Sequence, residues 1–222
     1  SAVVEDLVPL LSAYKRRNPK GNVSLINAAY EMASAAHSHQ SRMSGELYIS
    51  HPIAVARIVA EIGLDEVSLV AALLHDAVED TEITLADVEA RFGAEVAGIV
   101  DGLTKLERLQ FDSREAQQAA TMRKMLVAMA KDMRVLIIKL SDRMHNMRTI
   151  ASAPVDKQRR IAQETLDIYA PLAHRLGMQE MKQQLEDLSF AALFPKRYAE
   201  LDHLVSIRAP ERDVYLAKAL GQ

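Results

Sequence analysis

The sequence contains no cysteine and no tryptophan, and it has few of the residues that interrupt helices. Without cysteine, a disulfide framework, thiolate catalysis and thiolate metal sites are all excluded. Eight glycines and seven prolines among 222 residues are fewer than an average globular protein contains. Aromatic residues make up only 5%, and short alternating segments bounded by turn dipeptides are missing. These absences argue against a fold rich in β-strands.

An excess of positive charge and a long hydrophobic run are also missing. The formal net charge is −3, whereas a dedicated nucleic-acid-binding domain normally carries a basic excess. The longest apolar run, Leu69 to Leu74, is far too short to cross a bilayer. The first 17 residues interrupt their apolar stretch with acidic side chains, which makes a poor signal peptide. We therefore expect a cytoplasmic protein that binds neither a membrane nor nucleic acid directly.

The residues that are abundant favour helices. Hydrophobic residues make up 49% and charged residues 26%, as in an ordinary globular protein. Ala, Leu, Met, Glu, Lys, Gln and Arg dominate, and all are strong helix formers. We therefore predict an all-α fold. The expected helices span residues 24–39, 51–63, 84–92, 95–106, 116–130, 134–150, 156–176 and 179–194. A further helix should begin after Asp65, and two short ones should begin at Pro195 and Pro210. We also expect a mobile loop at 107–114, and a kink or restart of the helix at Pro171.

The first unusual segment is the apolar run Leu69–Leu74 with the polar residues that follow it. Six consecutive apolar residues at helical length imply burial on all sides. Four ionisable residues then occur within six positions: His75, Asp76, Glu79 and Asp80. If the helix continues, they all lie at one end of it, where buried charges are costly unless they are paired or bound to a metal. The alternative is an acidic helix end that dips into solvent.

The second unusual segment is the predicted helix at 134–150, which has two opposite stripes at helical spacing. The apolar stripe consists of Leu136, Leu140, Met144 and Met147, and the polar stripe consists of Asp142, His145, Asn146 and Thr149. An amphipathic helix with one wet face would look similar. However, Val135 and Ile138 continue the polar stripe toward the N-terminus, so that face should be covered as well. This pattern is typical of a pocket wall.

The third segment, residues 42–52, has a turn at Gly45 and a histidine at a helix start, His51. By itself it would be read as a turn with a capping histidine.

Together, the three segments offer a mixed set of imidazoles and carboxylates: His51, His75, Asp76 and Asp142. Such a set suits Mn²⁺, Fe²⁺ or Zn²⁺ and leaves positions for water and a phosphate oxygen. Glu79 and Asp80 could then orient or deprotonate that water.

The order His, His-Asp, Asp on helices resembles the HD-domain phosphohydrolases. The flanking motifs are similar to the hydrolase domain of RelA/SpoT-homologue alarmone enzymes. They lie at residues 44–52 (SGELYISHP), 71–81 (AALLHDAVEDT), 100–106 (VDGLTKL), 138–149 (IKLSDRMHNMRT), 169–178 (YAPLAHRLGM) and 185–190 (LEDLSF), and the stretch 208–216 resembles the actinobacterial type of long Rel proteins.

This resemblance implies an HD-domain helical bundle at residues 1–175, with a helical extension at 176–222 that would lead to a synthetase domain. The chain would then be an N-terminal piece of a longer bifunctional protein. The implied activity is manganese-dependent removal of the 3′-pyrophosphate of (p)ppGpp, which yields GDP or GTP and pyrophosphate and controls the stringent-response alarmone. The implied partners are this guanine nucleotide and, in the full-length protein, a synthetase domain and regulatory domains, with the ribosome as a further partner to consider.

The resemblance also implies a role for each residue of the site. His51, His75, Asp76 and Asp142 would bind Mn²⁺, with Glu79 and Asp80 as the catalytic acidic pair. Arg42 would pack on the guanine with Ser44 nearby, and Asn146 and Thr149 would contact the ribose and 5′-phosphate region. The sequence departs from frequent family residues at Met43, Leu47 and Ser141.

Two alternatives stay open at this point. Another HD-domain phosphohydrolase, acting on a deoxynucleotide or a cyclic dinucleotide, would share the metal set without the flanking motifs. A catalytically silent regulatory HD domain would have lost a ligand or the acidic pair. Because neither is lost here, we predict an active hydrolase.

Overall fold

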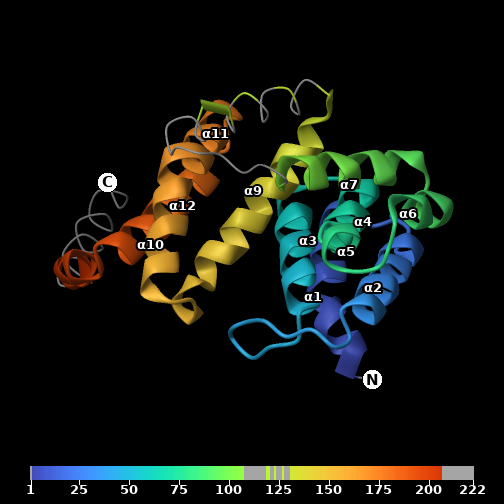
Figure 1. Cartoon of the computed structure of the whole chain (residues 1–222), viewed down its shortest axis with the longest axis horizontal. Helices are drawn as coiled ribbons and strands as arrows, with labels where there is room; N and C mark the ends of the chain where they lie inside the picture. Colours follow the sequence, from blue (N-terminus) through green and yellow to red (C-terminus); the bar gives the residue numbers. More distant parts are fainter. Residues whose placement is uncertain (1, 108–118, 121–122, 124–126, 128–130, 207–222) are drawn as a thin grey trace, which may run out of the picture. The chain divides into compact units, whose positions relative to one another are not determined.

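The computed structural model describes residues 2–107, 119–120, 123, 127 and 131–206 (Figure 1). All regular elements in these residues are helices, apart from a single bridge between Ser41 and Leu47, so the predicted all-α fold is confirmed.

The chain divides into two compact units, Ser1–Ser152 and Ala153–Gln222. The expected boundary between residues 175 and 176 stays a prediction. The expected loop at 107–114, most of the helix expected at 116–130 and the one expected at Pro210 lie outside the described residues.

The first unit is built around a short apolar helix. Its helices are α1 (Ala2–Arg17), α2 (Ser24–Ala36), α3 (Ser50–Ile62), α4 (Glu66–Leu74), α5 (Ala77–Asp80), α6 (Leu85–Phe92), α7 (Ala94–Glu107) and α9 (Met133–Arg148), with a 3-10 turn at Ile150–Ser152. Helix α4 packs against α2, α3, α7 and α9, and every residue from Ser68 to Leu74 is buried. This burial on all sides is what six consecutive apolar residues predict.

Capping side chains and one glycine set several helix ends where the sequence predicts them. The Asp65 carboxylate accepts a hydrogen bond from the Ser68 amide at the start of α4, and Thr84 forms a capping box with Asp87 at the start of α6. Gly63 ends α3 with φ of +100°, a conformation that side chains with a Cβ rarely adopt. Helix α1 was not predicted, although it contributes Leu7, Leu10 and other residues to the core.

The structure corrects one prediction, which placed four ionisable residues on one continuous helix. Helix α4 ends at Leu74, His75 and Asp76 form a turn, and α5 begins at Ala77. The break has a local cause, because the His75 ring Nδ1 lies 2.7 Å from the carbonyl oxygen of Ala72. In a continued helix, that oxygen would accept from the amide of Asp76 instead.

The second unit contains α10 (Val155–Glu164), a π-helical turn (Thr165–Tyr169), α11 (Ala170–Arg175) and α12 (Gln179–Leu193), and residues 195–206 are also helical. The π-turn ends two residues before Pro171, which lies in the first turn of α11. A proline within a helix clashes with the carbonyl four residues before it. The wider turn relieves that clash, and the helix restarts at the proline as the sequence predicts.

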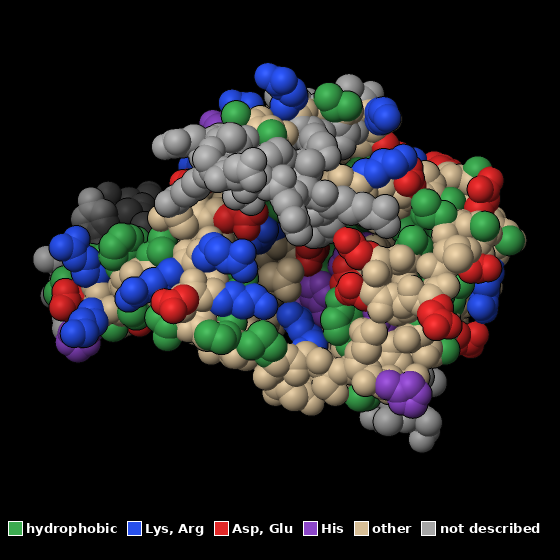
Figure 2. Space-filling model, viewed as in Figure 1, with side chains coloured by type: hydrophobic (Ala, Val, Ile, Leu, Met, Phe, Trp, Pro, Cys, Tyr) green, Lys and Arg blue, Asp and Glu red, His purple; other side chains and the backbone are tan. Residues whose placement is uncertain are grey.

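Helix hydrophobicity and surface charge both agree with the composition. Among the described residues, no helix is both long enough and apolar enough to span a membrane. Among the described residues on the face shown in Figure 2, both acidic and basic side chains are exposed.

Candidate active site and metal centre

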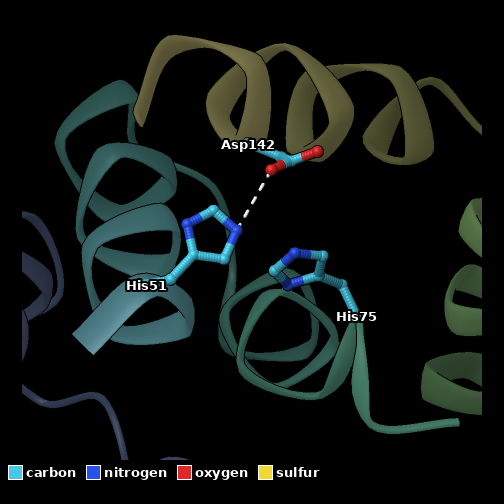
Figure 3. Close-up of side chains that lie close together, drawn as sticks. All are labelled: His51, His75 and Asp142. Atoms are coloured by element: carbon cyan, nitrogen blue, oxygen red, sulfur yellow. Dashed lines mark ion pairs between the residues drawn. The ribbon is translucent and has the colours of Figure 1, made fainter. Parts of the chain in front are cut away.

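Three buried side chains from distant parts of the sequence meet in the first unit (Figure 3). His51 comes from the first turn of α3, His75 from the turn after α4, and Asp142 from the middle of α9. Each offers one ligand atom, and these atoms lie within 4.8 Å of one another. The side chains are 4–6% exposed, so packing of the three helices determines their positions.

The hydrogen bonds of His75 leave its Nε2 without a well-aligned partner. Nδ1 is the donor to the Ala72 carbonyl, since a carbonyl oxygen can only accept. Nε2 is buried and makes no hydrogen bond, although it lies 3.0 Å from Oδ1 of Asp76. When Nε2 gives up its proton, as it must to bind a metal, His75 directs the lone pair of this nitrogen into the cluster.

His51 faces two different groups through its two ring nitrogens. Its Nε2 lies 3.1 Å from Oδ1 of Asp142 and 3.7 Å from Oδ2 of Asp76. Its Nδ1 lies 2.7 Å from Nδ1 of His145 on α9. Burial lowers the pKa of His51 below its ordinary value, and the contact with Asp142 only partly opposes that shift. The neutral, metal-binding form of this imidazole is therefore favoured.

The two carboxylates give the cluster a negative potential. Burial alone would raise the pKa of Asp142, but Lys139 and His51 keep it well below its ordinary value. Its Oδ2 accepts from Lys139 at 2.9 Å and its Oδ1 accepts from Asn146 at 2.7 Å. Burial would likewise lower the pKa of His75, yet Asp76 and Asp142 raise it to about 9. The cluster thus attracts a positive charge at its centre.

These residues fit a divalent cation. Neutral imidazoles and ionised carboxylates are ligands for Zn²⁺, Fe²⁺ and Mn²⁺, and the buried Nε2 of His75 is an electron-pair donor that lacks a partner. His51, His75 and Asp142 lie at the centre of the candidate site. Asp76, the fourth predicted ligand, lies beside them and contacts both histidines.

A tyrosine hydroxyl links the cluster to the predicted catalytic pair. The Tyr48 hydroxyl lies 2.6 Å from Oδ2 of Asp76 and 3.1 Å from Oδ2 of Asp80. Its ring stacks on His37 at a centroid distance of 4.5 Å. Burial and the neighbouring Asp76 raise the pKa of Tyr48, so that the hydroxyl keeps its proton. Glu79 and Asp80, on α5, are exposed and accessible to water.

Three of the predicted substrate-binding residues contact one another. The Arg42 guanidinium donates from Nη2 to Asn146 Oδ1 and to Thr149 Oγ1, both at 3.2 Å, and from Nη1 to His145 Nδ1 at 3.0 Å. The fourth, Ser44, is exposed on the same loop and donates to Glu46 at 3.4 Å. The structure therefore brings Arg42, Asn146 and Thr149 together and leaves Ser44 apart from them.

The three departures from the family pattern leave the predicted ligands in place. Met43 and Leu47 are both exposed on the loop before α3. Ser141 is buried, and its hydroxyl donates to the carbonyl of Ile137 at 2.8 Å within α9. Asp142 follows directly on the same helix.

Three residues that contact the site, Tyr48, Lys139 and His145, are not among the predicted catalytic, substrate-binding or metal-binding residues. The sequence does place His145 on the polar stripe of the predicted pocket wall, with Asp142 and Asn146. Lys139 lies three residues before Asp142, which is also a helical neighbour. The contacts of Tyr48 with residues 28 and 32 positions away had no periodic signal.

Comparison with known proteins places this site in a family. A family model described as the HD domain matches residues 29–179. The chain belongs to the HD domain family. The matched residues include all four predicted metal ligands and the predicted acidic pair of this HD domain.

Relatives of this HD domain confirm the resemblance to RelA/SpoT homologues. It is 54% identical over 216 residues to the bifunctional (p)ppGpp synthase/hydrolase RelA of Mycobacterium tuberculosis, covering 97% of this chain and 29% of that protein. It is 47% identical over 218 residues to the bifunctional (p)ppGpp synthase/hydrolase SpoT of Escherichia coli, covering 98% and 31%. The chain thus spans less than a third of the length of these relatives.

One solved structure is similar to this HD domain over nearly the whole length of the solved chain. It is that of a metazoan SpoT orthologue described as hydrolysing ppGpp and acting in starvation responses. The TM-score is 0.51 at 26% identity, and the alignment covers 83% of this chain and 96% of that one.

Proposed function

We propose that this HD domain hydrolyses the alarmone (p)ppGpp at its 3′-pyrophosphate, yielding GDP or GTP and pyrophosphate. The observation that carries the proposal is the similarity to the metazoan orthologue. The long bacterial relatives combine synthase and hydrolase activities in proteins of which this chain covers only a third or less. The orthologue, by contrast, is described as a ppGpp hydrolase and is covered over 96% of its length. This likeness supports hydrolysis rather than synthesis for the matched part.

The proposed metal is Mn²⁺, held by His51, His75, Asp76 and Asp142. The ligand chemistry also suits Fe²⁺ and Zn²⁺, and the choice of manganese rests on the family resemblance. A bound divalent ion would polarise a phosphoryl oxygen and lower the pKa of water at the site. Lys139 and Asn146 hold the Asp142 carboxylate in place, and the Ala72 carbonyl fixes the tautomer of His75.

The proposed proton acceptors are Glu79 and Asp80. Asp80 is tied to the ligand Asp76 through the Tyr48 hydroxyl, and its exposed position leaves it accessible to water. In the proposed reaction, one water attacks the phosphorus bonded to the ribose 3′-oxygen, and that P–O bond breaks. The water oxygen ends on the released pyrophosphate, and a water proton passes through the acidic pair to the departing 3′-oxygen, which becomes the 3′-hydroxyl of GDP or GTP. This assignment requires a carboxylate at position 80.

The proposed nucleotide contacts are Arg42, Ser44, Asn146 and Thr149. The guanidinium plane of Arg42 suits stacking on a base, and the amide and hydroxyl of the other two suit ribose and phosphate oxygens. Because Arg42 donates to Asn146 and Thr149 in this structure, a bound nucleotide would replace these contacts.

Around this site, we propose the arrangement of the long relatives. Residues 1–175 would form the hydrolase domain, and 176–222 would lead to a synthetase domain followed by regulatory domains in a cytoplasmic protein. The names of the bacterial relatives support a synthetase part. The ribosome as a partner of the full-length protein stays a prediction, which rests on the resemblance alone.

The test is the release of pyrophosphate and GDP from ppGpp, with and without Mn²⁺. We expect metal-dependent release by the wild type, its loss in Asp80→Ala, and full retention in Glu89→Gln, which removes an exposed carboxylate on α6 instead. Hydrolysis of a deoxynucleotide or a cyclic dinucleotide but not of ppGpp would favour another HD phosphohydrolase. Binding of Mn²⁺ and ppGpp without turnover would instead favour a silent regulatory domain.

A further inference from the structure

His145 is the residue through which the loop bearing Arg42 meets the candidate metal centre. Its Nδ1 lies 2.7 Å from Nδ1 of His51 and 3.0 Å from Nη1 of Arg42. The two imidazole rings are 5.0 Å apart at their centroids, with an interplanar angle of 36°. His145 is half-buried on α9, one turn after Asp142.

The direction of these hydrogen bonds follows from which groups carry protons. A guanidinium can only donate, so Nδ1 of His145 must be an acceptor toward Arg42. A nitrogen that accepts carries no proton, and therefore the short contact between the two rings requires the proton on Nδ1 of His51. Arg42 and His51 then share the one lone pair of Nδ1 of His145. His51 then has its free electron pair on Nε2, which is the atom beside Asp142.

We propose that His145 is a positioning residue that holds His51 in the tautomer required for metal binding, and that Arg42 holds His145 in its accepting tautomer. This inference rests on the metal centre of the proposed function and deepens it. A ligand histidine generally passes its other ring N–H to an acceptor that fixes its orientation and raises its basicity. The usual acceptor is a carboxylate or carbonyl, whereas here it is a second imidazole.

The first test compares two substitutions at one position by titrating Mn²⁺ into the full chain and measuring Kd by calorimetry. His145→Leu keeps the approximate size and removes the acceptor. His145→Asn keeps an acceptor, because Oδ1 of Asn is bonded to Cγ as Nδ1 of His is. We expect the Kd for Mn²⁺ to rise roughly 10- to 100-fold in His145→Leu and to stay close to wild type in His145→Asn. His39→Leu, at an exposed histidine, should bind as the wild type does.

The second readout is the tautomer of His51, observed by nitrogen-15 NMR of protein loaded with diamagnetic Zn²⁺. The wild type and His145→Asn should show a protonated Nδ1 on His51, and His145→Leu should lose this single tautomer. A role in packing alone would change the thermal stability of the metal-free protein without restoring affinity in His145→Asn.

Several outcomes would overturn the inference. These are an unchanged Kd in His145→Leu, an equal loss in His145→Asn, or a wild-type His51 protonated on Nε2. A wild type that binds no Mn²⁺ would overturn it together with the metal centre. If the wild type binds Mn²⁺ but does not hydrolyse ppGpp, only the proposed function fails, and the affinities of the two variants still decide the role of His145.

Discussion

The candidate site combines two regions of opposite character. His51, His75 and Asp142 are buried and come from α3, the end of α4, and α9, which pack together in the core. The acidic pair on α5 and the loop carrying Arg42 and Ser44 lie largely at the surface. The buried region is therefore preorganised for an ion, while the surface region can rearrange around a larger ligand. Tyr48 and His145 connect the two regions.

The largest expected effect comes from a change within the buried region. His75→Ala removes a proposed ligand whose orientation the core fixes through the Ala72 carbonyl. We expect the Kd for Mn²⁺ to rise by at least about 100-fold, more than substituting an outer-shell partner does, with loss of ppGpp hydrolysis. Calorimetric titration with Mn²⁺ and a pyrophosphate-release assay measure both. Tight Mn²⁺ binding by the variant would remove His75 from the ligand set.

A change in the connection between the two regions should have the next largest effect. Tyr48→Phe keeps the ring stacked on His37 but removes the hydroxyl shared by Asp76 and Asp80. A hydrogen bond to a charged group contributes about 1.5–3 kcal/mol, which corresponds to roughly a 10- to 100-fold lower kcat if the bond is needed in the transition state. Steady-state kinetics at saturating Mn²⁺ would measure this. An unchanged kcat would show that Asp80 needs no support from Tyr48.

A change in the surface region should mainly weaken nucleotide binding. Arg42→Met removes the guanidinium that donates to Asn146 and Thr149. We expect KM for ppGpp to rise about tenfold, equivalent to roughly 1.4 kcal/mol. The Kd for Mn²⁺ should change by less than about tenfold, because Arg42 acts on His51 only indirectly, through His145. A loss of Mn²⁺ affinity as large as that in His75→Ala would contradict the separation of the two regions.

The smallest expected effect is on stability, at an ion-pair cluster apart from the site. Arg134 on α9 pairs with Asp65 at the start of α4, Glu95 on α7 and Asp132. All these side chains are partly exposed, and such pairs contribute about 0.2–1 kcal/mol each. Arg134→Met should lower the melting temperature by roughly 2–4 °C and leave ppGpp hydrolysis unchanged. A loss of hydrolysis without a loss of stability would contradict this.

The same cluster predicts a dependence on pH. Burial opposes the shift, but hydrogen bonds from Ser68 and the charge of Arg134 lower the pKa of Asp65, and hydrogen bonds from Arg134 lower that of Asp132. A lowered pKa contributes stability that is complete above the unfolded value of about 4 and is lost as the pH falls through the folded value. The stability difference between the wild type and Arg134→Met should therefore shrink in acid. Chemical denaturation at pH 7 and pH 3 would measure it.

Much of the site was predictable because its residues follow helical spacing. The two stripes at 134–150 identify both the buried face with Leu136 and Met144 and the polar face with Asp142, and the structure confirms them. The caps at Asp65 and Thr84 were also predictable, since each acts within three residues. Helix α1 was missed because its opening residues were considered only as a targeting segment.

Two other features could not be predicted. The sequence suggested that the helix continues through His75, but the ring of His75 contacts the Ala72 carbonyl that continuation requires. This contact is local, yet it is a side-chain contact that helical spacing does not reveal. The pairing of His145 with His51 joins residues 94 positions apart, and no local pattern specifies it.

The sequence by itself determined the all-α fold, the buried central helix and the types of residue available for a metal, because these follow from composition and from periodicity within single helices. Only the tertiary structure decided which of these residues face one another, which ring nitrogen is free to bind a cation, and which side chains link the metal centre to the loop of Arg42. Those properties depend on distances and directions between elements, which are set by the packing of α3, α4 and α9.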